Sequence, residues 1–163
     1  MSDASDGSDD APGSTPDVGV FHDIQVGDTT ETGGRTITEA DVVNFAGVSG
    51  DFNHLHLDEE AMQESLFGER IAHGMLVLSA ATGLLWQNRT PEERDAVVAF
   101  YGMDEVRFRG PVFMGDRIHV ELEVVEKRET DSAMGTGTIK YDVAIKKQDG
   151  STVISCSMLS LVQ

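Results

Sequence analysis

Basic side chains are scarce in this chain of 163 residues, which has 12 Lys and Arg against 29 Asp and Glu and a formal net charge of −17. A surface this rich in carboxylates repels phosphate groups, so we expect neither nucleic acid nor an anionic membrane as a partner. Dense carboxylates also keep proteins soluble at high salt. We therefore predict a halophilic protein, the alternative being an acidic protein without that adaptation.

Cysteine and long hydrophobic runs are also lacking. The single Cys156 rules out a disulfide framework, and its apolar surroundings suggest a thiol that packs as a small hydrophobic group. The longest apolar stretch, residues 74–86, is shorter than the roughly 20 residues that a membrane-spanning helix needs, and indicates a buried helix. The N-terminus has no basic and hydrophobic segments typical of a signal peptide. We expect a cytoplasmic protein.

The N-terminal segment differs in composition from the rest of the chain. Residues 1–18 are rich in Asp, Ser and Pro and have almost nothing to pack, which predicts a disordered acidic tail. Hydrophobic residues make up 39% of the chain, enough for one core. We expect a single domain over residues 19–163.

The first half of that domain predicts helices after a short strand. Apolar residues between turn signals predict the strand within residues 20–36. Thr38, followed by Asp41, has the pattern of a capping box and predicts the start of a helix. A short helix is expected over residues 58–66. A longer one, over about 75–88, is apolar on nearly every face and should be surrounded by protein.

The second half alternates apolar and polar residues, which is typical of strands with one buried face. An Asp149-Gly150 pair marks a hairpin turn before the last of them. Helices followed by antiparallel strands indicate an α+β fold with the helices on one face of a sheet. The predicted strands cover residues 102–108, 117–127, 137–147 and 153–162.

Acid–base chemistry is concentrated in the loop between the first two helices. Asp51 and His56 lie close together there, and a carboxylate beside an imidazole can hold a water molecule and move its proton. Asn53 adds a donor and an acceptor that can orient either partner. Gly74 begins the buried helix, where the helix dipole makes its N–H a good donor to a developing oxyanion.

These residues also have simpler interpretations. Asp51 and Asn53 can be turn and cap residues, and His56 can be a hydrogen-bonded structural histidine. We interpret His73 as structural or as a helix cap. His54, with the other two histidines and Asp51, could in principle bind a metal, but no second close pair of ligands completes such a site, so we expect no metal.

In combination, the residues of this loop resemble a known signature. Phe45, the segment Ser-Gly-Asp-Phe-Asn-His-Leu-His at residues 49–56 and the later His73-Gly74 are similar to the signature of MaoC-like dehydratases and (R)-specific enoyl-CoA hydratases, a branch of the hotdog superfamily. Residues 106–116 resemble a strand segment of that family. His54 stands where the family usually has proline.

The resemblance implies a fold, an activity and partners. The fold is a hotdog, a curved antiparallel sheet around a long central helix, forming at least a homodimer. The activity is reversible hydration of trans-2-enoyl-CoA to (R)-3-hydroxyacyl-CoA in fatty-acid or polyhydroxyalkanoate metabolism, without cofactor or metal. Asp51 and His56 would activate water, Asn53 would support them, and the Gly74 N–H would bind the enolate oxygen. The candidates for binding the anionic CoA are Arg70, Arg107, Arg109 and Arg117.

Two other functions remain open within the same superfamily. A hotdog thioesterase would place its carboxylate on the central helix, but residues 75–86 contain neither Asp nor Glu. A non-catalytic hotdog subunit that binds acyl-CoA would have no reason to keep Asp51, Asn53, His56 and Gly74 together.

Overall fold

The computed structural model describes residues 20–130 and 133–163, so the predicted acidic tail over 1–18 lies outside the described residues. The elements, in chain order, are α1 (Val20–Asp23), β1 (Thr29–Glu31), β2 (Arg35–Thr36), α2 (Glu39–Ser49), α3 (His54–Leu57), α4 (Glu59–Gln63), α5 (Gly74–Asn88), α6 (Pro91–Ala96), β3 (Val97–Phe108), β4 (Arg117–Glu129), β5 (Gly137–Lys147) and β6 (Thr152–Val162).

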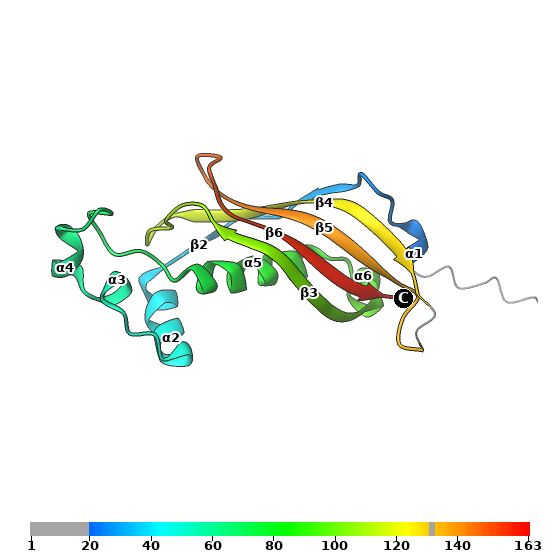
Figure 1. The fold of residues 1–163 in the computed structure, drawn as a ribbon, viewed down its shortest axis with the longest axis horizontal. Coiled ribbons are helices and arrows are strands. Elements are labelled where there is room, and N and C mark those ends of the chain that lie inside the picture. The colour runs from blue at the N-terminus through cyan, green and yellow to red at the C-terminus, as the bar shows by residue number, and fades with distance from the viewer. Residues whose placement is uncertain (1–19, 131–132) are drawn as a thin grey trace, which may run out of the picture.

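The strands form one curved antiparallel sheet in the order β1-β4-β5-β6-β3, with β2 also paired to β4. Helix α5 runs along one face of this sheet, and α2, α3 and α4 gather beyond one end of it (Figure 1). The predicted α+β architecture, a long helix against a curved antiparallel sheet, is confirmed.

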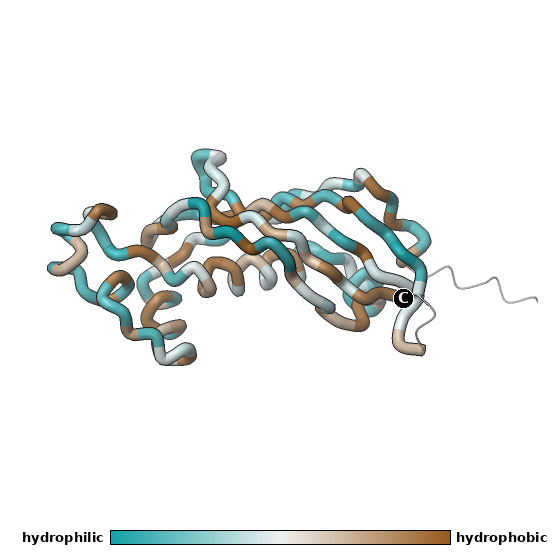
Figure 2. Tube along the Cα trace, in the orientation of Figure 1, coloured by the Kyte–Doolittle hydropathy of each residue, from teal (hydrophilic) through white to brown (hydrophobic). Residues whose placement is uncertain are grey.

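The core lies between α5 and the face of the sheet that it covers. Val77 and Ala81 on the helix belong to one apolar cluster with Val120 and Ile145 on the strands. Polar and apolar segments alternate along the strands, as the period of two predicts (Figure 2). Cys156 is buried in the same cluster, and burial raises the pKa of its thiol, so it packs as the predicted hydrophobic group.

The strand predicted within residues 20–36 starts later than its apolar residues suggest. Residues Val20–Asp23 form one helical turn instead, and pairing with β4 begins only at Thr29. Phe21 explains the difference, because its buried ring packs with Ile139 and lies under the ammonium group of Lys127, 4.5 Å from Nζ. These tertiary contacts override the local strand pattern.

Besides α1, two short helices, α3 and α6, were not predicted. The N-cap of helix α6 is Thr90, which forms a capping box with Glu93, and a proline begins the first turn, so the sequence contains a helix signal there. Helix α3 is a single turn in the loop that we expected to be irregular. Its N-terminus is capped by the Asn53 side chain, which accepts a hydrogen bond from the Leu55 N–H at 3.0 Å.

Helix α5 is not surrounded by protein on all sides within this chain. Met75 is 54% exposed and Trp86 is 48% exposed. Ser79 and Thr82 are exposed between them, which makes a stripe along one side of the helix. Packing within the chain therefore does not account for the apolar residues on this face.

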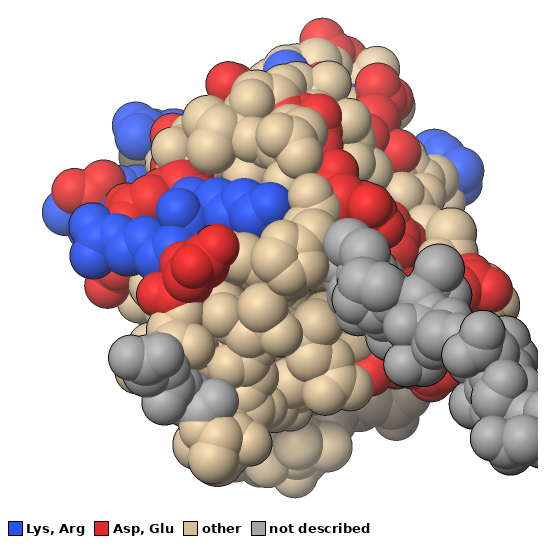
Figure 3. All heavy atoms as spheres, turned by 90° about the vertical axis from the view of Figure 1, so that its right-hand side faces the viewer, with Lys and Arg blue, Asp and Glu red and all other residues tan. Residues whose placement is uncertain are grey.

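Acidic side chains outnumber the basic ones that could neutralise them. Lys146 pairs with Glu121 at 2.6 Å and Lys147 with Asp116 at 3.1 Å. At the end of the molecule that carries the C-terminus, a band of Lys and Arg side chains is flanked by Asp and Glu (Figure 3). Because the chain has 29 acidic residues and only 12 basic ones, basic side chains are too few to neutralise the carboxylates one for one. Among the residues described, no helix is long and apolar enough to cross a membrane.

Candidate active site

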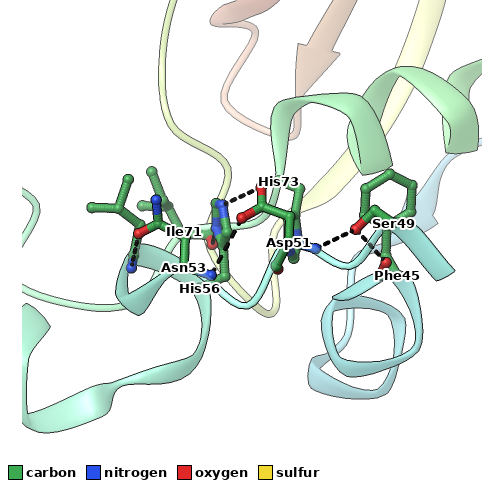
Figure 4. A network of polar contacts seen from close by, with 8 residues as sticks. Phe45, Ser49, Asp51, Asn53, His56, Ile71 and His73 are labelled. Carbon is green, nitrogen blue, oxygen red and sulfur yellow. Dashed lines mark hydrogen bonds and ion pairs between the residues drawn. The ribbon is translucent and has the colours of Figure 1, made fainter. Parts of the chain in front are cut away.

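The loop that carries Asp51 starts at the end of α2. Gly50 ends the helix with a φ of 76°, a left-handed conformation that glycine adopts without strain, and its N–H bonds to the Ala46 carbonyl at 2.9 Å. The Ser49 hydroxyl donates to the Phe45 carbonyl at 2.7 Å and accepts from the Asp51 N–H at 3.2 Å (Figure 4). The helix end thus fixes the main chain of Asp51.

Asp51 and Asn53 have the turn and cap roles that their spacing allows. Asp51 Oδ1 accepts a long hydrogen bond from the Asn53 N–H at 3.3 Å, and the Asn53 side-chain oxygen caps α3. The other oxygen of Asp51, Oδ2, lies on the side of His56. The turn therefore leaves one carboxylate oxygen free to face the imidazole.

His56 is buried, and its ring is oriented by one strong contact. Nδ1 lies 2.7 Å from the carbonyl oxygen of Ile71. Because a carbonyl only accepts, Nδ1 carries a proton, so in the neutral imidazole Nε2 is the nitrogen with a free lone pair. Nε2 lies 3.9 Å from Asp51 Oδ2, too far for a direct hydrogen bond but close enough for one water molecule to contact both groups.

His73, which we expected to be structural or a cap, lies within the same cluster. Its side chain makes no capping bond to α5. Instead Nε2 lies 3.0 Å from the Asp51 carbonyl oxygen, and the ring stacks on His56 with centroids 3.6 Å apart. The sequence did not predict this contact, because 22 residues separate the bonded partners. The two rings lie together in Figure 4.

Gly74 is the first residue of α5, as predicted. Within residues 20–130 and 133–163, no acceptor is found for its N–H, which lies at the positive end of a helix of 15 residues. A Cβ at this position would come 2.5 Å from Cε1 of Phe108, whose ring is largely exposed. The Phe108 ring therefore lies against the face of Gly74 where a side chain would project.

Arg70, which we predicted as a candidate for binding CoA, is already paired with two carboxylates. Its guanidinium bonds to Glu39 at 2.9 Å and to Glu59 at 2.8 Å, and the side chain is only 15% exposed. The hydrogen bond to Glu39, followed by that to Glu59, raises the pKa of Arg70. Arg70 thus joins α2 to α4. Of the other candidates, Arg107 donates to the Val106 carbonyl and Arg109 to the Ser155 hydroxyl.

A metal does not suit the histidine cluster, although ligand atoms of Asp51, His56 and His73 lie within 4.8 Å of one another. The two imidazole planes are tilted by only 28°, so their in-plane lone pairs do not converge on one point. Zinc would require nitrogen atoms at about 2.0–2.1 Å in convergent directions.

A cavity of about 870 Å³ lies beside the C-terminal half of α5. Leu85 and Trp86 line it from the helix, and Tyr141 and Met158 line it from the sheet. Burial raises the pKa of Tyr141, so its phenol stays neutral at physiological pH. Thr82, at the near edge, follows Gly74 by about 12 Å along the helix axis, at a rise of about 1.5 Å per residue.

Comparison with known proteins identifies the family. Residues 23–146 match the model of a protein family that is described as the MaoC-like domain. The chain belongs to the MaoC-like dehydratase family. The protein MaoC of Klebsiella aerogenes is 47% identical over 107 residues, which are 66% of this chain and 31% of that protein. An (R)-specific enoyl-CoA hydratase of Aeromonas caviae is 38% identical over 101 residues, 62% of this chain and 71% of that enzyme.

Solved structures give the same fold. A protein from Archaeoglobus described as a monoamine oxidase regulatory protein superposes with a TM-score of 0.78 at 40% identity, covering 87% of this chain and 92% of that one. A Mycobacterium tuberculosis protein described as a double hotdog fold has a TM-score of 0.74 at 18% identity, covering 87% of this chain and 43% of that one. The second likeness concerns the fold alone, and the fold of this chain is a hotdog.

Proposed function

We propose that this MaoC-like protein catalyses the reversible hydration of trans-2-enoyl-CoA to (R)-3-hydroxyacyl-CoA. The observation that carries the proposal is the arrangement at the start of α5. His56 Nε2 faces Asp51 Oδ2 at 3.9 Å, and the Gly74 N–H, which has no acceptor among the described residues, begins the helix next to His73. The relative in Aeromonas caviae, named for this activity, supports the same reaction class.

In the hydration direction, the water molecule is held between Asp51 and His56. His56 Nε2 accepts one of its protons as the water oxygen forms a bond to C3 of the enoyl group. The electron pair of the C2–C3 double bond moves toward the thioester carbonyl and gives an enolate. A proton from the Asp51–His56 pair then bonds to C2, the carbonyl re-forms, and water has been added without any external oxidant or reductant.

The charge on the enolate oxygen is the part of the reaction that most needs stabilisation. The Gly74 N–H supplies a donor and the dipole of α5 adds favourable electrostatic energy at the same point. Loss of one such donor typically costs about 10²–10³ in rate. The absence of a Cβ at Gly74 makes room for the Phe108 ring beside the N-terminus of α5.

The acyl chain of the substrate fits the cavity beside the C-terminal half of α5. An acyl group whose thioester lies at Gly74 would extend along the helix to reach Thr82 at the cavity edge. The walls from Leu85, Trp86 and Met158 are apolar, as an alkyl chain requires. This cavity would therefore set the preferred chain length.

A second copy of the chain is the proposed partner of the sheet edge. Strand β3 pairs only with β6 among the described strands, so its other edge has unpaired main-chain groups, and Phe100 and Tyr101 on it are exposed. Such a long apolar edge needs a cover. Edge-to-edge pairing of two β3 strands would supply one, and light scattering after size exclusion should give twice the mass of the chain.

Two other functions remain as contrasts. A thioesterase with a carboxylate on the central helix is disfavoured, since α5 has no Asp or Glu. A non-catalytic acyl-CoA-binding subunit would not need His56 Nε2 to face the Asp51 carboxylate.

One assay separates all three functions. Crotonyl-CoA is incubated with the protein, loss of the enoyl absorbance is followed, and the product is analysed on a chiral column. The expected product is (R)-3-hydroxybutyryl-CoA. Release of free CoA thiol would indicate a thioesterase instead, and binding without turnover would indicate the non-catalytic subunit.

A further inference from the structure

His73 has a nitrogen that packing alone does not explain. Its side chain is 3% exposed, and Nδ1 is buried without a hydrogen-bond partner among the described residues. Buried polar atoms in native proteins are almost always paired, so an unpaired one calls for a reason. A phenylalanine would fill the same space without leaving a polar atom unpaired.

The other nitrogen supplies that reason. Nε2 lies 3.0 Å from the Asp51 carbonyl oxygen, and because a carbonyl can only accept, Nε2 carries the proton and donates it. Nδ1 is therefore the unprotonated nitrogen of the ring. Burying it without a partner is the energetic cost of the hydrogen bond that Nε2 donates to Asp51. Only a residue with an N–H at that point can hold the Asp51 main chain.

The face of the same ring fixes His56. The two imidazoles are stacked at 3.6 Å between centroids, and Phe45 packs on His73 at 5.1 Å, tilted by 59°. His56 is also tied through Nδ1 to Ile71, which leaves rotation and sliding of its ring as the remaining freedom. The stack limits both motions.

We propose that His73 is a positioning residue that sets the separation between the Asp51 carboxylate and His56 Nε2. It binds the main chain of one residue and the ring of the other, and so joins the two groups that must share one water molecule. The role rests on the proposed hydratase function, but the geometry that it describes is measurable without substrate. His73 itself has no exposed nitrogen with which to exchange a proton with substrate.

Two substitutions separate the effect of the hydrogen bond between His73 and Asp51 from the effect of the stacking of His73 on His56. His73→Phe keeps a flat ring against His56 but removes the N–H to Asp51. His73→Gln places an amide nitrogen near the position of Nε2 but removes the ring. His119→Gln is the matched control, because this histidine lies on β4 beside Glu31 and Glu121, outside the site.

Kinetics and melting are measured on the same preparations. We expect His73→Phe to lower kcat for crotonyl-CoA hydration roughly 10- to 100-fold with little change in KM, since small misplacements of reacting groups cost about that much. Its melting temperature should not fall, because an unpaired buried nitrogen is removed. His73→Gln should retain more kcat than His73→Phe while melting lower, and the control should match the wild type in both. Full activity of His73→Phe, or parallel losses of kcat and melting temperature, would overturn the proposal.

A second readout does not depend on turnover. In the wild type, the carboxyl ¹³C shift of Asp51 should follow protonation of His56, because charges this close interact. His73→Phe should weaken that response and His73→Gln should preserve it. An unchanged response in His73→Phe would refute positioning even if activity fell. If the wild type does not hydrate enoyl-CoA, the hydratase function is rejected. A weakened response in His73→Phe would still support the positioning role.

Discussion

The surroundings of the two ends of helix α5 are built from different kinds of contacts. At its N-terminus, single polar contacts from distant segments fix the site: Ile71 holds His56, and His73 holds Asp51. At its C-terminus, no single contact dominates, and apolar side chains such as Leu85 and Trp86 bound a volume. The N-terminal end should be sensitive to displacements of the reacting groups by an ångström. The C-terminal end should be sensitive to changes in the size of the side chains that line the cavity. Chemistry and chain-length preference should therefore be separable by mutation.

The largest effect is expected from the acid–base pair at the N-terminal end. Asp51→Asn and His56→Ala should each lower kcat by orders of magnitude, because each removes a group that holds or moves the proton of the same water. The double variant should be barely worse than either single variant, as for residues that act as a unit. Steady-state kinetics with crotonyl-CoA and circular dichroism as a folding control measure this. A single variant with near-wild-type turnover would remove the assignment.

A smaller effect is expected from Gly74→Ala, roughly 10- to 1000-fold in kcat, since a methyl group would obstruct the oxyanion donor. The new Cβ must also displace the Phe108 ring, which is exposed enough to move, so the melting temperature should fall only slightly. Adding Phe108→Leu to Gly74→Ala relieves that collision. If kcat recovers with the second substitution, the loss came from packing and the oxyanion role fails.

The opposite end of the helix gives a change in specificity rather than in chemistry. Leu85→Trp should fill part of the cavity and lower kcat/KM for a long-chain enoyl-CoA by about tenfold, while crotonyl-CoA loses less. The ratio of the two kcat/KM values is the measurement. Equal losses for both substrates would mean that the cavity does not hold the acyl chain.

The smallest effect is expected from salt on the melting temperature. Salt should act on the charged surface as a whole and not on either end of α5. Unpaired carboxylates repel one another over a screening length of about 10 Å at 0.1 M salt, and far less in molar salt. The melting temperature should therefore rise between about 0.1 M and 2 M KCl. A flat response would count against the halophilic prediction and leave the enzymatic one untouched.

Local signals explain which parts of the fold could be predicted. The Thr38–Asp41 capping box located the start of α2, and the alternation along β4, β5 and β6 located those strands, because both patterns depend on neighbouring residues. A capping box at Thr90 and Glu93 is a signal of the same kind at the start of α6. Helix α1 could not be predicted, since its form follows from Phe21 packing on residues more than 100 positions away.

The candidate site divides in the same way. The resemblance placed Asp51, His56 and Gly74 in one signature, and the structure brings the first two within 3.9 Å. The role of His73 could not be read from the sequence. A histidine before a helix looks like a cap, and only the folded chain shows its ring on His56 and its N–H on Asp51.

The bridge made by Arg70 has a consequence for how activity is lost on heating. Its planar guanidinium satisfies Glu39 on α2 and Glu59 on α4 at once, a geometry that a lysine cannot reproduce. Ile71, whose carbonyl holds His56, is the next residue. We expect the bridge to restrain local opening of the segment around the site, which requires less free energy than unfolding of the sheet. Inactivation should then precede melting, and the loss of the Arg70 bridge should widen the interval between the two temperatures.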